Sequence, residues 1–271
     1  MTLVLALAAG VLIGLSLGAL GGGGSILAVP VLVYLLDQSP AQATTGSLVV
    51  VGTTSAIGAL VAYRDDQVLL ARGTAFGAVA LGGAVVGAKA AAQVSESVLL
   101  ACFAALMLLV AGVMVTRLLS PASRTATANP VLDDPLITFS PKFACQCPRA
   151  LKVLTTATVV GLLTGFLGVG GGFLVVPALL LALAVPMEYA VGTSLLVITM
   201  TSAVALAVRA GAGVAPDWWL VAVLTAASTA GAVAGGRIAS RTGSFRLQAA
   251  FAVLVLVVAF YTAARAFPAL L

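Results

Sequence analysis

Two stretches decide the fold of this chain: GLSLGALGGGGSILAVP at residues 14–30 and GLLTGFLGVGGGFLVVP at residues 161–177. They align without gaps at an offset of 147, with ten of seventeen positions identical. In each stretch a cluster of glycines joins a long apolar segment to a short one. Shared apolar composition does not produce such an ordered set of glycines and a proline. The match therefore predicts an internal repeat of the chain.

The rest of the chain divides into apolar segments of the same kind, five on each side of a polar stretch. Three segments in each half are long enough for the roughly 20 residues that a membrane-spanning helix needs. The second segment of each half, with about 12–13 residues, is too short to span alone, so we expect a half-helix or re-entrant limb there. The segments lie at about 2–20, 25–36, 41–63, 68–91 and 96–119, and at about 150–168, 172–184, 187–210, 216–240 and 244–267.

Composition places these segments in a lipid bilayer. Of the 271 residues, 62% are hydrophobic and 8% are charged, against roughly 25% charged residues in a soluble domain. The sequence therefore predicts an all-α polytopic membrane protein. It contains no histidine, which removes Ser-His and Cys-His catalysis and two-His metal sites. We accordingly expect no enzyme activity, no cofactor, no metal and, at a net charge of only +5, no nucleic-acid partner.

The order of segments suggests a first membrane repeat at 1–119, a cytoplasmic linker loop at 120–149 and a second membrane repeat at 150–271. A cytoplasmic linker puts ten of the thirteen basic residues inside if the repeats are inverted, and nine if they are parallel. Either count favours this orientation, and the choice between inverted and parallel repeats stays open. Within the linker, Cys145 and Cys147 form a C-x-C that we interpret as incidental, with a thiol or redox role as the alternative.

The glycine clusters are the first candidate site. Glycine lets the backbone turn sharply and approach a ligand, and the short helix that follows presents its N-terminal N–H groups and partial positive charge. This is an arrangement for binding an anion inside the membrane. The alternative is that the glycines only allow close helix packing. The predicted substrate-binding residues here are Gly21, Gly23, Gly24, Ser25, Gly168, Gly170, Gly171 and Gly172.

Hydroxyl side chains follow each glycine cluster. Thr45 and Ser47 open the third segment of the first half, and Thr193 and Ser194 open the matching segment of the second half. Neutral hydroxyls of this kind could donate hydrogen bonds to an oxyanion and still release it. The alternative is a bond from each hydroxyl to a carbonyl one turn earlier in its own helix. Further hydroxyls come one to two turns later, at Thr53, Thr54, Ser55, Thr201 and Ser202.

Two basic residues occupy matching places near the ends of long segments. Lys89 and Arg237 could each attract an anion to a vestibule, and we include both as weak candidates. The alternative is that each side chain only extends to the membrane interface.

At this point the motifs resemble a known family. The pattern G-x-x-G-x-G-G-G-x-x-x-x-P at 165–177, its echo at 18–30 and A-x-G-T-S-L at 190–195 are similar to the sulfite exporter TauE/SafE family, also called the TSUP transporters. The resemblance covers nearly the whole chain. It implies a multi-pass inner-membrane protein of a bacterium or archaeon that moves sulfite, organosulfonates or related small anions.

We therefore expect a transporter that exports sulfite or a related sulfur oxyanion or organosulfonate, with the anion and the lipid bilayer as its partners. Outward movement of one negative charge gains about 2.3 kcal/mol per 100 mV when the cell interior is negative. The alternatives are a carrier of a different small organic anion, in either direction, and a non-transporting accessory membrane subunit. The sequence leaves open whether the chain forms a homo-oligomer.

Overall fold

The computed structural model describes residues 2–91, 94, 96–119, 147–167, 172–181, 183, 185–209 and 216–266. All regular structure in these residues is helical, which confirms the all-α prediction. Five of the helices are long and apolar enough to cross a membrane. The elements are α1 Thr2–Leu20, α2 Gly23–Pro30, the π-helical turn η1 Val31–Leu35, α3 Pro40–Arg64, α4 Leu70–Ala91, α5 Glu96–Leu119, α7 Cys147–Leu167, α8 Gly172–Leu181, α9 Met187–Arg209, α10 Trp218–Ser240 and α11 Ser244–Ala266.

The two short helices lie where the sequence placed its half-length segments. α2 has 8 residues and α8 has 10. Pro30 ends the regular part of α2, and the wider turn η1 follows directly, because proline has no N–H and its ring displaces the carbonyl four residues earlier. Each short helix contains a proline at the same distance from its glycine cluster, Pro30 in α2 and Pro177 in α8.

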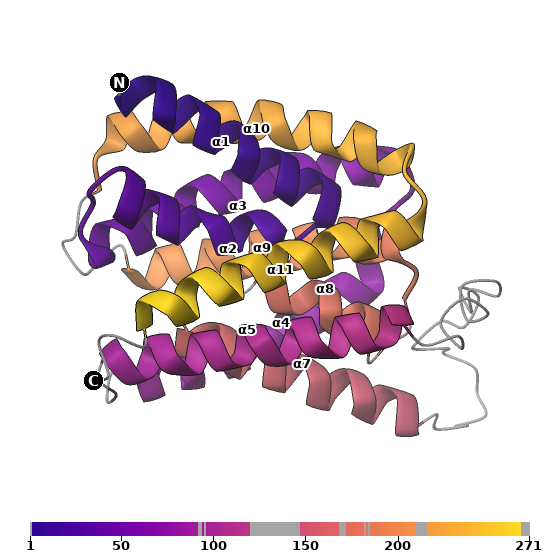
Figure 1. Cartoon of the computed structure of the whole chain (residues 1–271). Coiled ribbons are helices and arrows are strands. Elements are labelled where there is room, and N and C mark those ends of the chain that lie inside the picture. Colours follow the sequence, from indigo (N-terminus) through magenta and orange to yellow (C-terminus); the bar gives the residue numbers. More distant parts are fainter. Residues whose placement is uncertain are drawn as a thin grey trace.

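The helices pair across the two halves of the chain. α1 packs most extensively on α10, α4 on α7, α5 on α11 and α3 on α9, and α2 also contacts α8 (Figure 1). The first helix of each half thus packs on the fourth helix of the other half, and second, third and fifth helices pair with their counterparts. The halves consequently interlock, and neither forms a separate layer of the molecule.

Close backbone packing holds the largest of these contacts together. A Cβ built at Gly14 or Gly18 of α1 would collide with the carbonyl of Ser228 or Ala232 of α10. α4 and α7 make the matching contact, since a Cβ at Gly161 would collide with the carbonyl of Ala80. These positions behave as the small-residue interfaces that allow helices in membranes to approach closely.

The central helices α3 and α9 run in opposite directions. A Cβ at Gly52 would lie 3.0 Å from Ser202 Cβ, and a Cβ at Gly58 would lie 3.1 Å from Leu195 Cδ1. Residue numbers that rise along α3 therefore meet residue numbers that fall along α9. The third helices of the two halves are therefore antiparallel. If the halves are a repeat, the repeat is of the inverted kind that the sequence left open.

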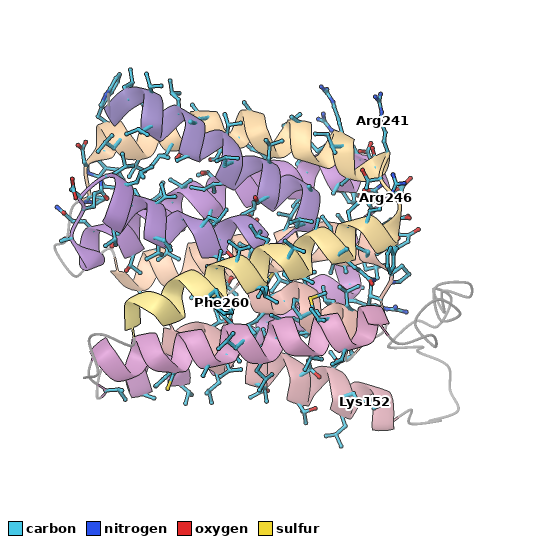
Figure 2. The ribbon with its side chains drawn as sticks, in the orientation of Figure 1. Lys152, Arg241, Arg246 and Phe260 are labelled. Carbon is cyan, nitrogen blue, oxygen red and sulfur yellow. The ribbon has the colours of Figure 1, made fainter. Side chains whose placement is uncertain are left out.

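The outer surface of the bundle is apolar, and several basic residues lie together at one end. Val208 and Trp219 are each 71% exposed and Phe260 is 69% exposed, as expected for side chains that face lipid. Lys152, Arg241 and Arg246 lie at the end of the bundle where α10 ends and α11 begins (Figure 2). This is the end that the positive-inside rule assigns to the cytoplasm.

Candidate functional site

The break between α1 and α2 turns at Gly21. Its φ of +76° lies in the left-handed region that favours glycine, and its N–H donates to Leu17 O at 2.8 Å. A Cβ at this position would lie 2.5 Å from Ser194 Oγ and 3.0 Å from Val191 Cα. Backbone conformation and space both require glycine here, and the requirement ties the break to the first turns of α9.

The two short helices begin inside the bundle and touch there. Ser25, in the first turn of α2, is 1% exposed, and its hydroxyl donates to Gly22 O at 2.7 Å. Gly172 begins α8, and a Cβ there would lie 2.9 Å from Ser25 Oγ and 2.7 Å from Ile198 Cδ1. Two helix N-termini, each with a partial positive charge, are thus brought together in a buried place. The predicted residues Gly168, Gly170 and Gly171 lie outside the described residues.

Two other predicted glycines make packing contacts. A Cβ at Gly24 would collide with Ile13 O of α1, and one at Gly23 would lie 2.7 Å from Leu254 Cδ2 of α11. These contacts match the packing alternative. A role of Gly23 and Gly24 in binding substrate stays a prediction.

The hydroxyls at the start of α3 and α9 are bonded within the protein. Ser47 Oγ donates to Thr44 O at 2.9 Å, and Ser194 Oγ donates to Val191 O at 2.7 Å, which is the intrahelical alternative. Thr193 Oγ1 accepts from Leu69 N at 3.1 Å and so ties α9 to the turn before α4. Thr45 is buried in the same region. A hydroxyl that donates to its own helix must give up that bond before it can donate to a substrate, and substrate binding by these residues stays a prediction.

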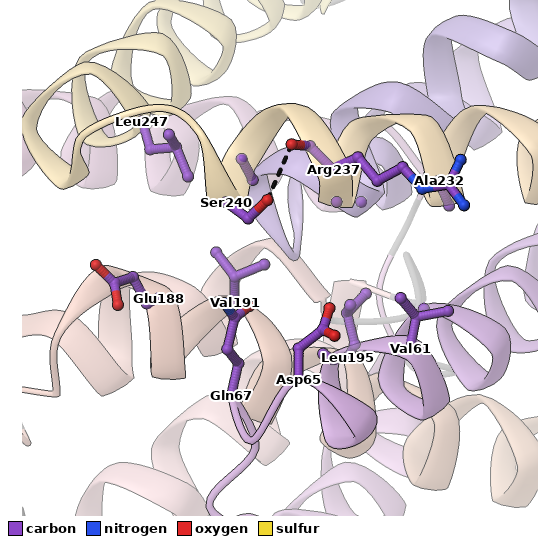
Figure 3. Close-up of a pocket in the computed structure, with 15 residues that line it drawn as sticks. Val61, Asp65, Gln67, Glu188, Val191, Leu195, Ala232, Arg237, Ser240 and Leu247 are labelled. Carbon is purple, nitrogen blue, oxygen red and sulfur yellow. Dashed lines mark hydrogen bonds between the residues drawn. The ribbon is translucent and has the colours of Figure 1, made fainter.

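An open pocket lies at the basic end of the bundle, between α1, α3, α9, α10 and α11 (Figure 3). The predicted attractor Arg237 lines it, and the Arg237 carbonyl accepts a hydrogen bond from Ser240 Oγ at 2.9 Å. Lys89 is exposed near the far end of α4, about 30 Å along that helix from its start. The structure therefore does not bring the two basic candidates together.

The pocket also contains polar residues that the sequence did not single out as a site. Asp65 and Gln67 come from the turn between α3 and α4, and Glu188 comes from the first turn of α9 (Figure 3). The charged residues from Arg64 to Asp66, followed by Gln67, were a visible signal of an exposed turn. Nothing in the sequence placed that turn beside Glu188, because the two belong to different halves of the chain.

The pocket lies next to the break between α1 and α2. Gly18, Val191 and Leu195 line it, and Gly21 is in contact with Val191. Its inner boundary includes Gly58 and Leu195, which pack against each other. The arrangement has a polar mouth at the basic end and a floor next to the glycine turn. Such a pocket can admit a small polar solute from one side of the membrane.

Comparisons with known proteins bear on this arrangement. Residues 6–262 match the family described as sulfite exporter TauE/SafE. Two relatives from Xylella fastidiosa, each named "Probable membrane transporter protein", are similar to this chain over 272 residues. The protein of strain Temecula1 is 28% identical and that of strain 9a5c is 29% identical, with 99% of this chain and 98% of the relative covered in each case. No solved structure matches the chain.

Proposed function

Because this chain belongs to the sulfite exporter TauE/SafE family of membrane transporters, we propose that it exports sulfite or a related sulfur oxyanion or organosulfonate. The membrane would be the inner membrane of a bacterium or archaeon. The protein would carry its substrate without altering it chemically. The relatives' names give transport without a substrate, so the anionic substrate is argued below from the described residues.

The observation that carries the proposal is the contact between the first turns of α2 and α8, at Ser25 and Gly172. Two helix N-termini in contact repel each other through their partial positive charges, and the surrounding apolar protein screens that repulsion weakly. An anion beside the two ends would relieve the repulsion and could accept hydrogen bonds from N–H groups of the first turns. A cation at the same place would increase the repulsion between the two ends.

The buried polar side chains support a weakly held anion. Those that the structure describes are serines, threonines and Gln38, all able to donate a hydrogen bond without carrying a charge. An anion held by neutral donors is bound less tightly than one paired with a buried arginine or lysine. This suits a transporter, which must release what it binds.

The pocket at the basic end provides the route from the cytoplasm. With the linker in the cytoplasm, the mouth beside Arg237 opens to the cell interior, and the floor lies beside Gly21. An anion that leaves the cell through this path gains about 2.3 kcal/mol per charge for each 100 mV of membrane potential.

We also infer that the two halves are inverted repeats that rock against each other to expose the site to each side in turn. Matching hydrogen bonds support this: Gln38 N donates to Leu32 O at 3.0 Å, and Val185 N donates to Leu179 O at 3.0 Å, 147 residues later. The exchange of partners among α1, α10, α4 and α7 also fits a two-fold relation between the halves.

The test is flux of radiolabelled sulfite in proteoliposomes under a potassium diffusion potential. We expect saturable flux that accelerates when the receiving side is positive, and ligand-dependent stabilisation of the purified protein against heat. A panel of sulfite, sulfate, thiosulfate, sulfoacetate and carboxylates would identify the preferred anion. Preference for a carboxylate would favour an organic-anion carrier. If no anion on the panel were transported and none stabilised the protein, the proposal would be overturned. The remaining alternative would then be a non-transporting accessory membrane subunit.

A further inference from the structure

Two buried hydroxyls in the central helices have no partner in the described part of the chain. Ser55 of α3 is 0% exposed and Ser202 of α9 is 1% exposed, and neither Oγ makes a hydrogen bond to any residue that the structure describes. A buried hydroxyl in an apolar place is unfavourable unless it is hydrogen-bonded. These two serines lie 147 residues apart, at matching positions of the two halves.

Other hydroxyls on the same two helices are satisfied. Thr53, Thr199 and Thr201 donate to carbonyls one turn earlier in their own helices. Thr54 Oγ1 bonds with Ser228 Oγ of α10 at 2.7 Å. A helical serine can rotate its hydroxyl onto such a carbonyl. Neither Ser55 Oγ nor Ser202 Oγ makes such a bond to a residue that the structure describes.

Both serines lie on the surfaces where α3 and α9 meet. A Cβ at Gly52, one turn before Ser55, would lie 3.0 Å from Ser202 Cβ and 3.8 Å from Ser202 Oγ. Val51 and Ala59, four residues to either side of Ser55, belong to the same apolar cluster as Ile198 of α9. We call this contact surface the α3–α9 seam. The seam thus carries two unbonded hydroxyls among apolar side chains.

The α3–α9 seam continues the pocket toward the ends of the short helices. Gly58 and Leu195 line the pocket, and Ser55 lies one turn deeper along α3 than Gly58. On α9, Ile198 follows Leu195 and precedes Ser202 by one turn, and Ile198 contacts Gly172 at the start of α8. The contact between Gly58 and Leu195 therefore separates the open pocket from the two hydroxyls.

We propose that Ser55 and Ser202 bind the transported oxyanion inside the bundle, each donating a hydrogen bond from its hydroxyl, after Leu195 has moved aside. The proposal rests on the proposed function and deepens it. Hydroxyls bind anions and cations alike, but the adjacent N-termini of α2 and α8 favour the anion. Symmetric placement gives one donor from each half, so either half can release the anion as the other retains it.

The test uses Ser55→Ala, Ser202→Ala and the double variant of the full chain in proteoliposomes with radiolabelled sulfite. Each lost hydrogen bond to a charged ligand should raise KM about tenfold or more. The melting temperature without ligand should stay the same or rise, because alanine removes a buried hydroxyl that has no partner. Ligand-induced stabilisation should shrink in parallel with the rise in KM.

Thr53→Ala is the matched control, since Thr53 is an exposed residue of the same helix whose hydroxyl bonds to Val49 O. It should leave KM unchanged. A double serine variant with wild-type KM and wild-type ligand stabilisation overturns the proposal, as does a lower melting temperature with unchanged KM, which indicates a structural role. If the double variant fails to insert, the single variants and Ser55→Cys decide by the same readouts. A wild-type protein that carries none of the anions overturns this proposal and the proposed function together, whereas wild-type flux with unaffected serine variants overturns this one alone.

Discussion

Ser25 and Gly172 touch where two short helices begin inside the bundle, and a Cβ at Gly172 would lie 2.9 Å from Ser25 Oγ. The two residues come from different halves of the chain and from the two glycine clusters that decide its fold. Their contact brings two helix N-termini to one place, and the N-terminus of a helix favours a negative charge.

The first prediction concerns this contact. Gly172→Leu should reduce anion flux by at least about tenfold, because the new side chain would meet both Ser25 Oγ and Ile198 Cδ1 and force the first turns of α2 and α8 apart. Overpacking of this kind costs about 1–3 kcal/mol, so we expect a folded, membrane-inserted protein. Flux in proteoliposomes and a thermal melt of the purified variant give the two readouts.

Gly82→Leu is the control, because Gly82 lies on α4 with no heavy atom within 4 Å of a Cβ built there. It should retain flux. If Gly172→Leu transported at the wild-type rate, the meeting of the short helices would have no part in the substrate path.

The second prediction compares glycine-to-alanine substitutions at two positions. We expect one to lower the free energy of unfolding and the other to raise it. Gly14→Ala should destabilise the protein by about 1–3 kcal/mol, because the new Cβ would collide with Ser228 O across the contact between α1 and α10. Gly112→Ala should stabilise it by about 0.5–1 kcal/mol, because Gly112 lies mid-helix in α5 with open space around it. Unfolding in mixed detergent micelles measures both. If both substitutions changed the stability equally, α1 and α10 would not be packed closely at Gly14.

The sequence predicted the helices well because apolar length alone determines which segments can enter a bilayer. The short segment expected at about 25–36 is α2 followed by η1. α2 begins two residues earlier than expected, at Gly23, with Gly22 as its N-cap. The short segment expected at about 172–184 is α8, which ends at Leu181.

The site was predictable only in part, for reasons that differ from residue to residue. The contact of Gly21 with Ser194 joins two predicted elements, and their repeated pattern pointed to both. The pattern could not distinguish Ser194, which bonds to its own helix, from Ser202, which does not, because a hydroxyl's rotamer depends on what packs around it. Asp65 and Glu188 share a pocket only through the way the two halves interlock.

The third prediction concerns the buried bond between Thr54 and Ser228, which ties α3 to α10 at 2.7 Å. A double-mutant cycle with Thr54→Val and Ser228→Ala should give a coupling energy of about 0.5–1.5 kcal/mol. Thr54→Val should be the milder single change, because Ser228 Oγ can still donate to Thr225 O, 3.2 Å away. Thermal or denaturant unfolding of the four proteins supplies the cycle. Additive single effects would show that the two hydroxyls do not stabilise each other.

The last prediction tests whether the pocket receives the anion. Arg237 is an exposed cation at the mouth, where Asp65 and Glu188 also lie, so Arg237→Glu leaves a pocket lined by three acidic side chains and no basic one among the described residues. The variant should raise KM severalfold at low ionic strength. The effect should fade toward 1 M salt, where charges are screened within about 3 Å. Initial rates from vesicles loaded at several salt concentrations measure this dependence.

Arg241→Glu makes the same charge change at the same end of the bundle, four residues later and outside the pocket lining. It should alter KM much less, because a charge at the pocket mouth acts on an arriving anion more strongly than one beside it. If the two variants had equal effects, Arg237 would contribute only to the general positive charge of this end of the bundle. A KM unaffected by Arg237→Glu at every salt concentration would mean that the anion enters by another route.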